Sequence, residues 1–115
     1  MNTRVKCVVV NTTVAKKSDA RALARKIVDA RLAACGQYLR IRSIYRWKGA
    51  VESAGEFLVL AKTRAALAGR LVAFIRRHHP YEVPEILVTP VLSGLPEYLN
   101  WIADETRPPK AQRRA

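Results

Sequence analysis

The spacing of hydrophobic residues changes several times along the chain, and each change predicts a new element. Residues 5–10 form a short β-branched run, which is typical of a buried strand. Residues 18–34 then follow the helical period, with Ser18 placed to cap the first turn. The apolar face of this helix consists of Leu23, Ile27, Ala30 and Ala34. Gly36 is expected to end the helix, because glycine accepts a positive φ.

From residue 38 the hydrophobic period becomes two, which predicts a half-buried strand over residues 38–48. One face carries Leu39, Ile41, Ser43, Tyr45 and Trp47, and the other carries Arg40, Arg42, Ile44, Arg46 and Lys48. This strand is about twice the common length. After a possible break at residues 53–55, the nearly continuous apolar run of residues 56–62 predicts a central strand covered on both faces.

The second half of the chain repeats this order. Thr63 is placed to cap a second helix, which Pro80 ends. Its apolar face consists of Leu67, Leu71, Phe74 and Ile75. Residues 85–89 predict a further strand, and residues 96–102 predict a last helix. The order strand, helix, strand, strand, helix, strand predicts an α+β protein with a ferredoxin-like antiparallel sheet, its two main helices on one face, in a single domain of residues 1–106.

Positive charge is the unusual feature of the composition. Among 115 residues, 21 are Lys or Arg and 9 are Asp or Glu, so the net charge is +12 at pH 7. Residues 107–115 form a basic tail that is predicted to be disordered. The rest of the chain remains basic, which predicts weak and salt-sensitive binding to polyanions.

Two features of the sequence bear on the cellular compartment of the protein. The free thiols of Cys7 and Cys35 are interpreted as buried core groups, because two cysteines do not make a disulfide framework. No apolar run is long enough for a membrane helix or a signal-peptide core. The sequence therefore predicts a cytoplasmic protein without a membrane partner.

Five motifs resemble the CutA divalent-cation-tolerance family. They are LAAC at 32–35, SIYRWKG at 43–49, LAKT at 60–63, HPYEVPEI at 79–86 and YLNW at 98–101. The HPYEVPEI block is the most specific of them. The resemblance implies a ferredoxin-like fold, a homotrimer built by strand pairing between subunits, and a likeness to PII-type signalling proteins. It also implies an association with copper or another divalent cation, and no established reaction.

His78 and His79 are the candidate metal ligands, because imidazole suits Cu(II), Zn and Ni. Adjacent residues on a helix point about 100° apart, so both rings reach one ion only if the helix frays before Pro80. His79 is the stronger candidate, with Glu82 as a source of an oxygen ligand. Some family members carry a thiol where this chain has Thr12, which removes the softest ligand. Each ring has an alternative interpretation as a packed structural side chain.

A second set of residues is predicted to line a ligand-binding cleft between subunits. The set consists of Tyr45, Trp47, Lys62, Tyr81 and Glu82. Aromatic rings of this kind also fill cores and subunit contacts. The alternative interpretation of Lys62 is a lysine at the end of a strand whose ammonium group reaches water. No phosphate loop, CxxC, HExxH or GxSxG motif is present, so no catalysis is predicted.

The alternative function is a basic nucleic-acid-binding module on a ferredoxin-like sheet. Its basis is the stripe of Arg40, Arg42, Arg46 and Lys48 along one strand face. The RNP1 pattern of an RNA-recognition motif is missing, because residues 56–59 read Glu-Phe-Leu-Val in the third strand.

Overall fold

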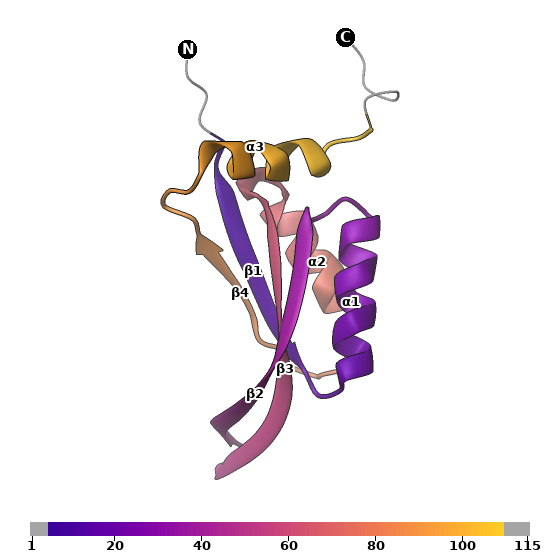
Figure 1. Ribbon diagram of the computed structural model, residues 1–115. Helices are drawn as coiled ribbons and strands as arrows, with labels where there is room; N and C mark the ends of the chain where they lie inside the picture. Colours follow the sequence, from indigo (N-terminus) through magenta and orange to yellow (C-terminus); the bar gives the residue numbers. More distant parts are fainter. Residues whose placement is uncertain (1–4, 110–115) are drawn as a thin grey trace.

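The computed structural model describes residues 5–109, arranged as four strands and three helices around one sheet (Figure 1). The elements are β1 (Cys7–Val14), α1 (Lys17–Asp29), β2 (Cys35–Trp47), β3 (Ala50–Arg64), α2 (Ala68–His78), β4 (Ile86–Pro90) and α3 (Pro96–Glu105), with a 3₁₀ turn at Ala65–Leu67 before α2. This is the predicted order of elements. Most of the predicted basic tail, residues 110–115, lies outside the described residues.

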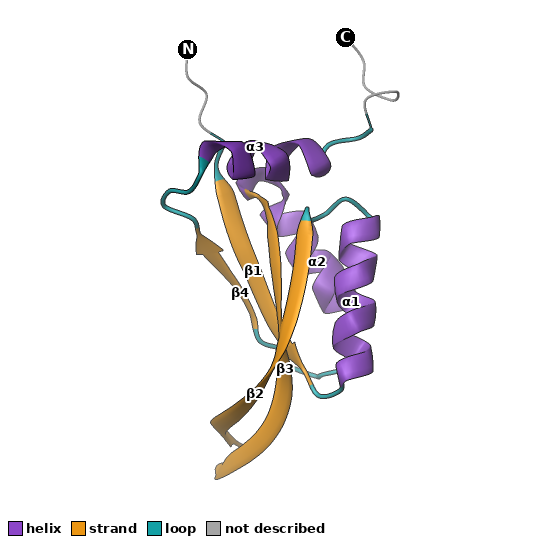
Figure 2. Ribbon diagram, viewed as in Figure 1, coloured by secondary structure: helices purple, strands orange, loops and turns teal. Residues whose placement is uncertain are grey.

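The four strands form one antiparallel sheet in the order β2-β3-β1-β4 (Figure 2). Strand β1 lies inside the sheet, with β3 on one side and β4 on the other. Val10, for example, lies opposite Ala61 of β3 and Val88 of β4. The first strand runs past Asn11 to Val14, farther than the apolar run predicts, because β3 pairs with it over its whole length.

Helices α1 and α2 cover one face of this sheet (Figure 1). Val8, Val10 and Ala61 point toward them. The helical side of this core consists of Leu23, Ile27, Leu71 and Ile75. Alternation along the strands directs Val9, Leu58 and Leu60 to the other side of the sheet, which we call the open face.

The open face is apolar and only partly buried. Leu39 of β2 is 48% exposed and Leu87 of β4 is 56% exposed. Leu58 and Leu60 of β3 are half-buried. The prediction that residues 56–62 form a strand covered on both faces is therefore wrong for a single chain, because α1 and α2 cover one face and α3 contacts the open face only at the Lys62 and Arg64 end of β3.

Strands β2 and β3 continue beyond the sheet as a two-stranded arm, residues 42–55, which curves away from the body (Figure 1). Its tip is a two-residue turn in which Lys48 and Gly49 both have positive φ, 48° and 83°. That combination is a type I′ turn, whose twist matches the flanking strands. The break predicted at residues 53–55 is absent, because each of these residues pairs with β2.

The end of α1 differs from the prediction. The helix ends at Asp29, and Arg31 takes the left-handed conformation at φ 58°. The Arg31 N–H donates to the Val28 carbonyl at 3.0 Å and the Leu32 N–H to the Ile27 carbonyl at 3.1 Å, which is a Schellman motif. Gly36 therefore lies within β2 and does not end the helix.

Two predicted caps are also wrong. Lys16 is the N-cap residue of α1, and Ser18 lies inside the helix. Thr63 is paired with Val8 and buried within β3, so it cannot begin a helix. The chain instead turns through Ala65–Leu67 before α2 starts at Ala68.

Two arginines bind the C-terminal end of α3. Arg64 donates from Nε to the Thr106 hydroxyl at 2.9 Å and from Nη2 to the Thr106 carbonyl at 3.1 Å. Arg31 donates to the carbonyls of Glu105 and Arg107 at 3.0 and 3.2 Å. Cations stabilise helix C-termini because they satisfy free carbonyls and oppose the helix dipole. Arg107, the first residue of the predicted tail, is thus attached to the body.

Close contact between β2 and α1 predicts a cost for any side chain at Gly36. A Cβ there would lie 3.1 Å from the Cβ of Ala24 and 3.3 Å from its Cα. We expect Gly36→Ala to lower the free energy of unfolding by about 1–3 kcal/mol, measured by urea denaturation, because α1 must move off the sheet.

Gly69→Ala is the control for that experiment. No atom lies within 4 Å of the Cβ position at Gly69, so this change should raise the free energy of unfolding by up to about 1 kcal/mol through helix propensity. In a double-mutant cycle, the losses of Ala24→Gly and Gly36→Ala should be less than additive, because the first change removes the methyl group that the second one meets. Fully additive losses would show that the contact is not the cause.

Candidate functional site

The segment between α2 and β4 folds back against the sheet through His79 and Tyr81. Pro80 forces His79 out of the helix, to φ −88° and ψ 135°. His79 Nε2 lies 2.8 Å from the Thr13 carbonyl oxygen, and the Tyr81 N–H donates to His79 Nδ1 at 3.1 Å. The Tyr81 hydroxyl donates to Glu56 Oε2 at 2.8 Å. We call these three residues the His79–Tyr81–Glu56 cluster.

The hydrogen bonds of His79 determine its protonation. A carbonyl only accepts, so Nε2 carries the proton, while Nδ1 accepts from the Tyr81 backbone. The ring is therefore neutral and both nitrogens are occupied. Burial lowers the pKa of His79 below its ordinary value, against smaller raising effects of the Thr13 hydrogen bond and the Glu56 and Asp19 carboxylates.

Thr13 is available to His79 because of the sheet register. Strand β4 pairs with β1 only as far as Thr12. Beyond that point β1 has lost its neighbour on this side, and the imidazole of His79 takes the place that a longer β4 would fill.

Tyr81 and Glu56 form the buried part of the cluster. Glu56 is 8% exposed, and the Tyr81 hydroxyl is its hydrogen-bond partner. Burial and then the bond to Glu56 raise the pKa of Tyr81 far above its ordinary value, so the phenol remains a protonated donor. Sequence reasoning missed Glu56 as a site residue. The available signal was an acid at the start of an apolar strand, which must find a partner when buried.

A second group lies toward the other end of β3. Lys62 Nζ lies 3.5 Å from the Tyr98 hydroxyl and 5.6 Å from the centroid of its ring. The Tyr98 and Trp101 rings of α3 lie 5.4 Å apart. We call these residues the Lys62–Tyr98–Trp101 group. It is about 20 Å along β3 from Glu56, by the rise of a strand.

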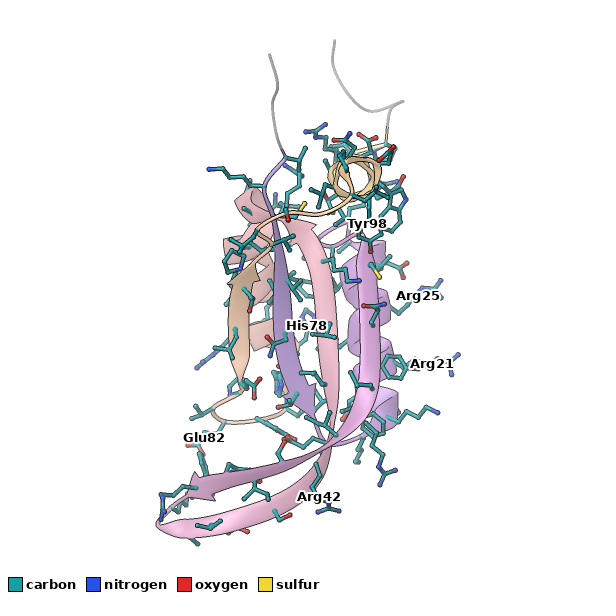
Figure 3. The ribbon with its side chains drawn as sticks, turned by 60° about the vertical axis from the view of Figure 1, so that its left-hand side comes forward. Arg21, Arg25, Arg42, His78, Glu82 and Tyr98 are labelled. Atoms are coloured by element: carbon teal, nitrogen blue, oxygen red, sulfur yellow. The ribbon has the colours of Figure 1, made fainter. Side chains whose placement is uncertain are left out.

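The predicted ligand-binding residues therefore do not converge within one chain. Tyr81 lies in one group and Lys62 in the other, while Glu82 is exposed; Figure 3 shows Glu82 and Tyr98 far apart along the molecule. Tyr45 and Trp47 lie on the arm, 43% and 41% exposed. Of these two, Tyr45 is near enough to the Tyr81 hydroxyl to contribute to its raised pKa.

The predicted metal ligands also point to different partners. His78 is exposed at the end of α2, and its Nδ1 lies 2.9 Å from the Phe74 carbonyl. Its ring packs on Phe74 with centroids 4.3 Å apart. Within residues 5–109, no three His, Cys, Asp or Glu side chains group closely enough to hold a metal ion. The described part of the chain thus brings His78 and His79 together with no third ligand of this kind.

Comparison with known proteins gives a consistent family. Residues 8–105 match the family model of the CutA1 divalent ion tolerance protein. A mouse protein named CutA is 44% identical over 76% of this chain and 50% of its own length. The divalent-cation tolerance protein CutA of Thermus thermophilus is 40% identical over 85% of this chain and 96% of its own.

Solved structures agree with this result. The crystal structure of CutA1 from Oryza sativa has a TM-score of 0.87 and 36% identity, covering 92% of this chain and 98% of that one. The chain spans about half of the length of the mouse relative and three-fifths of a Xenopus laevis homologue.

The prediction of a cytoplasmic location is wrong, because the similar proteins point to other compartments. The similar proteins of Arabidopsis thaliana and rice are named chloroplastic. A similar protein of known structure from Archaeoglobus fulgidus is described as periplasmic. Its structure has a TM-score of 0.85 and 29% identity, covering 88% of this chain and 99% of that one. None of the described helices has the length and apolarity of a membrane span.

The lowered pKa of His79 predicts acid sensitivity. The folded protein holds a neutral ring, whereas the unfolded chain takes up a proton below about pH 6.5. Stability from this residue is therefore present above pH 6.5 and lost as the pH falls through the folded pKa. Urea unfolding at pH 7.5 and 5.5, both approximate settings around that value, should show a smaller difference in His79→Gln than in the wild type.

His78→Gln is the matched control for the loss of an imidazole. A His79→Gln protein with the full wild-type pH dependence between the same two conditions would show that His79 does not cause it.

Proposed function

Since this chain belongs to the CutA1 divalent ion tolerance protein family, we propose that it acts as a homotrimer in divalent-cation tolerance. It does so by binding metal or a small ligand in a regulatory role, like PII-type proteins, and not by catalysis. The observation that supports this proposal best is the open face of its ferredoxin-like sheet. An apolar sheet face of this kind needs cover.

Other copies of the chain are the simplest cover for the open face. Its apolar residues are Val9, Leu39, Ile41, Leu58, Leu60 and Leu87. Burial of such surface stabilises association by about 25 cal/mol per Å². Strand β2 is also a long edge strand, with backbone groups free to pair with another chain. The number three is inferred from the family resemblance, and a closed ring of copies satisfies every such edge.

The ligand site is then proposed to lie between subunits. One chain separates Tyr81 and Glu82 from Lys62, while Tyr45 and Trp47 project on the arm beyond its own sheet. A neighbouring copy is what could bring an arm to the Lys62–Tyr98–Trp101 group. Lys62 would supply the positive charge for an anionic ligand, and the rings would supply flat apolar surfaces.

Binding is favoured over catalysis by the state of the cluster. His79 has no free nitrogen to act as a base, and the Tyr81 phenol is held protonated against Glu56. These contacts hold His79 and Tyr81 against the sheet. The residues that resemble catalytic groups thus have structural partners.

For the metal, the hydrogen bonds of the two rings favour His78 over His79. Donation from Nδ1 of His78 to the Phe74 carbonyl leaves Nε2 with its lone pair directed away from the helix backbone. A backbone carbonyl behind the ring in this way is the usual support for a metal-binding imidazole. His79 would have to break a hydrogen bond first. We therefore propose His78 as the primary Cu(II) contact, with His79 secondary.

The trimer is tested by light scattering. We expect a mass of about three times 12.9 kDa for the wild type. Leu39→Lys should shift the mass toward the monomer, because it places a charge on the proposed interface.

Val28→Lys is the matched control, since Val28 is 37% exposed and belongs to α1, which lies on the side of the sheet opposite to the open face. It should leave the mass unchanged. A wild-type mass of one chain at all concentrations would contradict the proposal.

Copper binding is tested by calorimetry on the wild type, His78→Ala and His79→Gln. We expect modest affinity for Cu(II) that weakens as the pH falls through the histidine range, because protons compete for the nitrogen lone pair. Most of the heat should be lost in His78→Ala and retained in His79→Gln. The opposite result would return His79 to the centre of the site, and unchanged binding in both variants would remove both histidines from it.

A further inference from the structure

Two arginines converge over a glycine at the base of the arm. The Nη2 atoms of Arg40 and Arg42 each lie 4.0 Å from the position that a Cβ would occupy on Gly55, which pairs with Arg42 across the strands. Gly55 does not have a positive φ, so its backbone does not require glycine. Its missing side chain leaves open the space between two guanidinium groups. We call Arg40 and Arg42 the arginine pair.

No described carboxylate neutralises the arginine pair. The ion pairs among residues 5–109 involve Arg25, Arg31 and Arg107. Arg40 lies 6.0 Å from the centroid of the Phe57 ring, and Arg42 donates to the Ser53 hydroxyl at 3.1 Å. Alternation directs the nearest acids of β3, Glu52 and Glu56, to the opposite face. Two like charges held together without a counterion favour an anion between them.

The arginine pair continues a basic surface on the helical side of the sheet. Figure 3 shows Arg21 and Arg25 projecting from α1 into solvent, with Arg42 beyond the end of that helix. Helices α1 and α2, with the N-cap residue of α1, carry Lys16, Lys17, Arg21, Arg25, Lys26, Arg70, Arg76 and Arg77 against only two acids, Asp19 and Asp29. Self-association through the open face would leave this side exposed in every subunit.

We propose that the arginine pair and the cations of α1 bind the phosphate backbone of a nucleic acid without reading its bases. A guanidinium matches a phosphate with two parallel hydrogen bonds, and the pair offers two such groups at one opening. Nucleic acid is favoured over an anionic membrane because α1 exposes one large apolar residue, Val28, for insertion into lipid. This is not RNA-recognition-motif binding, since the arginines lie on the side opposite to the open face.

Fluorescence anisotropy with a labelled DNA duplex and a labelled single-stranded RNA tests the proposal across a salt series. The variant Arg40→Gln/Arg42→Gln should weaken duplex binding about tenfold at low salt and lower the slope of log affinity against log salt by about 2. Arg113→Gln/Arg114→Gln removes the same charge from the C-terminal segment and should leave the slope unchanged. Equal losses in both variants would overturn the assignment to the arginine pair.

Gly55 offers a matched pair of variants. Gly55→Glu places a carboxylate between the guanidiniums and should weaken binding as much as removing them, whereas Gly55→Gln adds the same bulk without charge and should bind like the wild type. The Gly55→Gln protein also checks that the arm tolerates a side chain. Wild-type affinity in Gly55→Glu would overturn the proposal.

Two further outcomes separate this inference from the proposed function on which its exposed face rests. Vesicles containing phosphatidylserine that bind through Arg40 and Arg42, with no binding to duplex or RNA, would overturn the choice of nucleic acid. A wild-type trimer that binds no nucleic acid would overturn this inference alone. A monomer that binds through the pair would support this inference and contradict only the self-association.

Discussion

Helices α1 and α2 cover one face of the sheet and α3 contacts only one end of the other, and most other features follow from this limit. The hydrophobic effect buries Val8, Val10 and Ala61 beneath α1 and α2, while strand alternation sends Val9, Leu58 and Leu60 to the open face. The exposed leucines and the arginine pair therefore lie on opposite sides of the sheet.

The His79–Tyr81–Glu56 cluster shows how a polar group is kept within such an architecture. Glu56 lies on the open face at the point where the arm leaves the sheet, and Tyr81 reaches it from a segment between α2 and β4. His79 forms a hydrogen bond with the Thr13 carbonyl, which lies beyond the last residue that β4 pairs with. His79 and Tyr81, which the sequence offers as candidate ligand-binding residues, thus have structural partners at the edge of the sheet.

Periodicity predicts the order of elements here because both periods are strongly expressed, in α1 at Leu23 and Ile27 and in β2 at its alternating arginines. It fails at ends. Arg31, not Gly36, takes the left-handed position, and its side chain binds carbonyls at the end of α3, a partner that is distant in sequence. Glu56 could not be assigned for the same reason: its partner is set by folding of residues 79–85, which no local pattern contains. The chemistry of the side chains supplied the candidate residues but not their grouping in space.

Strand β3 carries Gly55, Glu56, Lys62 and Arg64 in one unbroken run, so its length has an evolutionary consequence. Inserting or deleting a single residue within that run would turn every following side chain to the opposite face, exchanging leucines for core residues. The turn at Lys48 and Gly49 lies outside this restriction. Residues can be added or removed there in matched pairs, one on each strand, and the register below is preserved. The arm is thus the part of this molecule whose reach can vary between species without disturbing the rest.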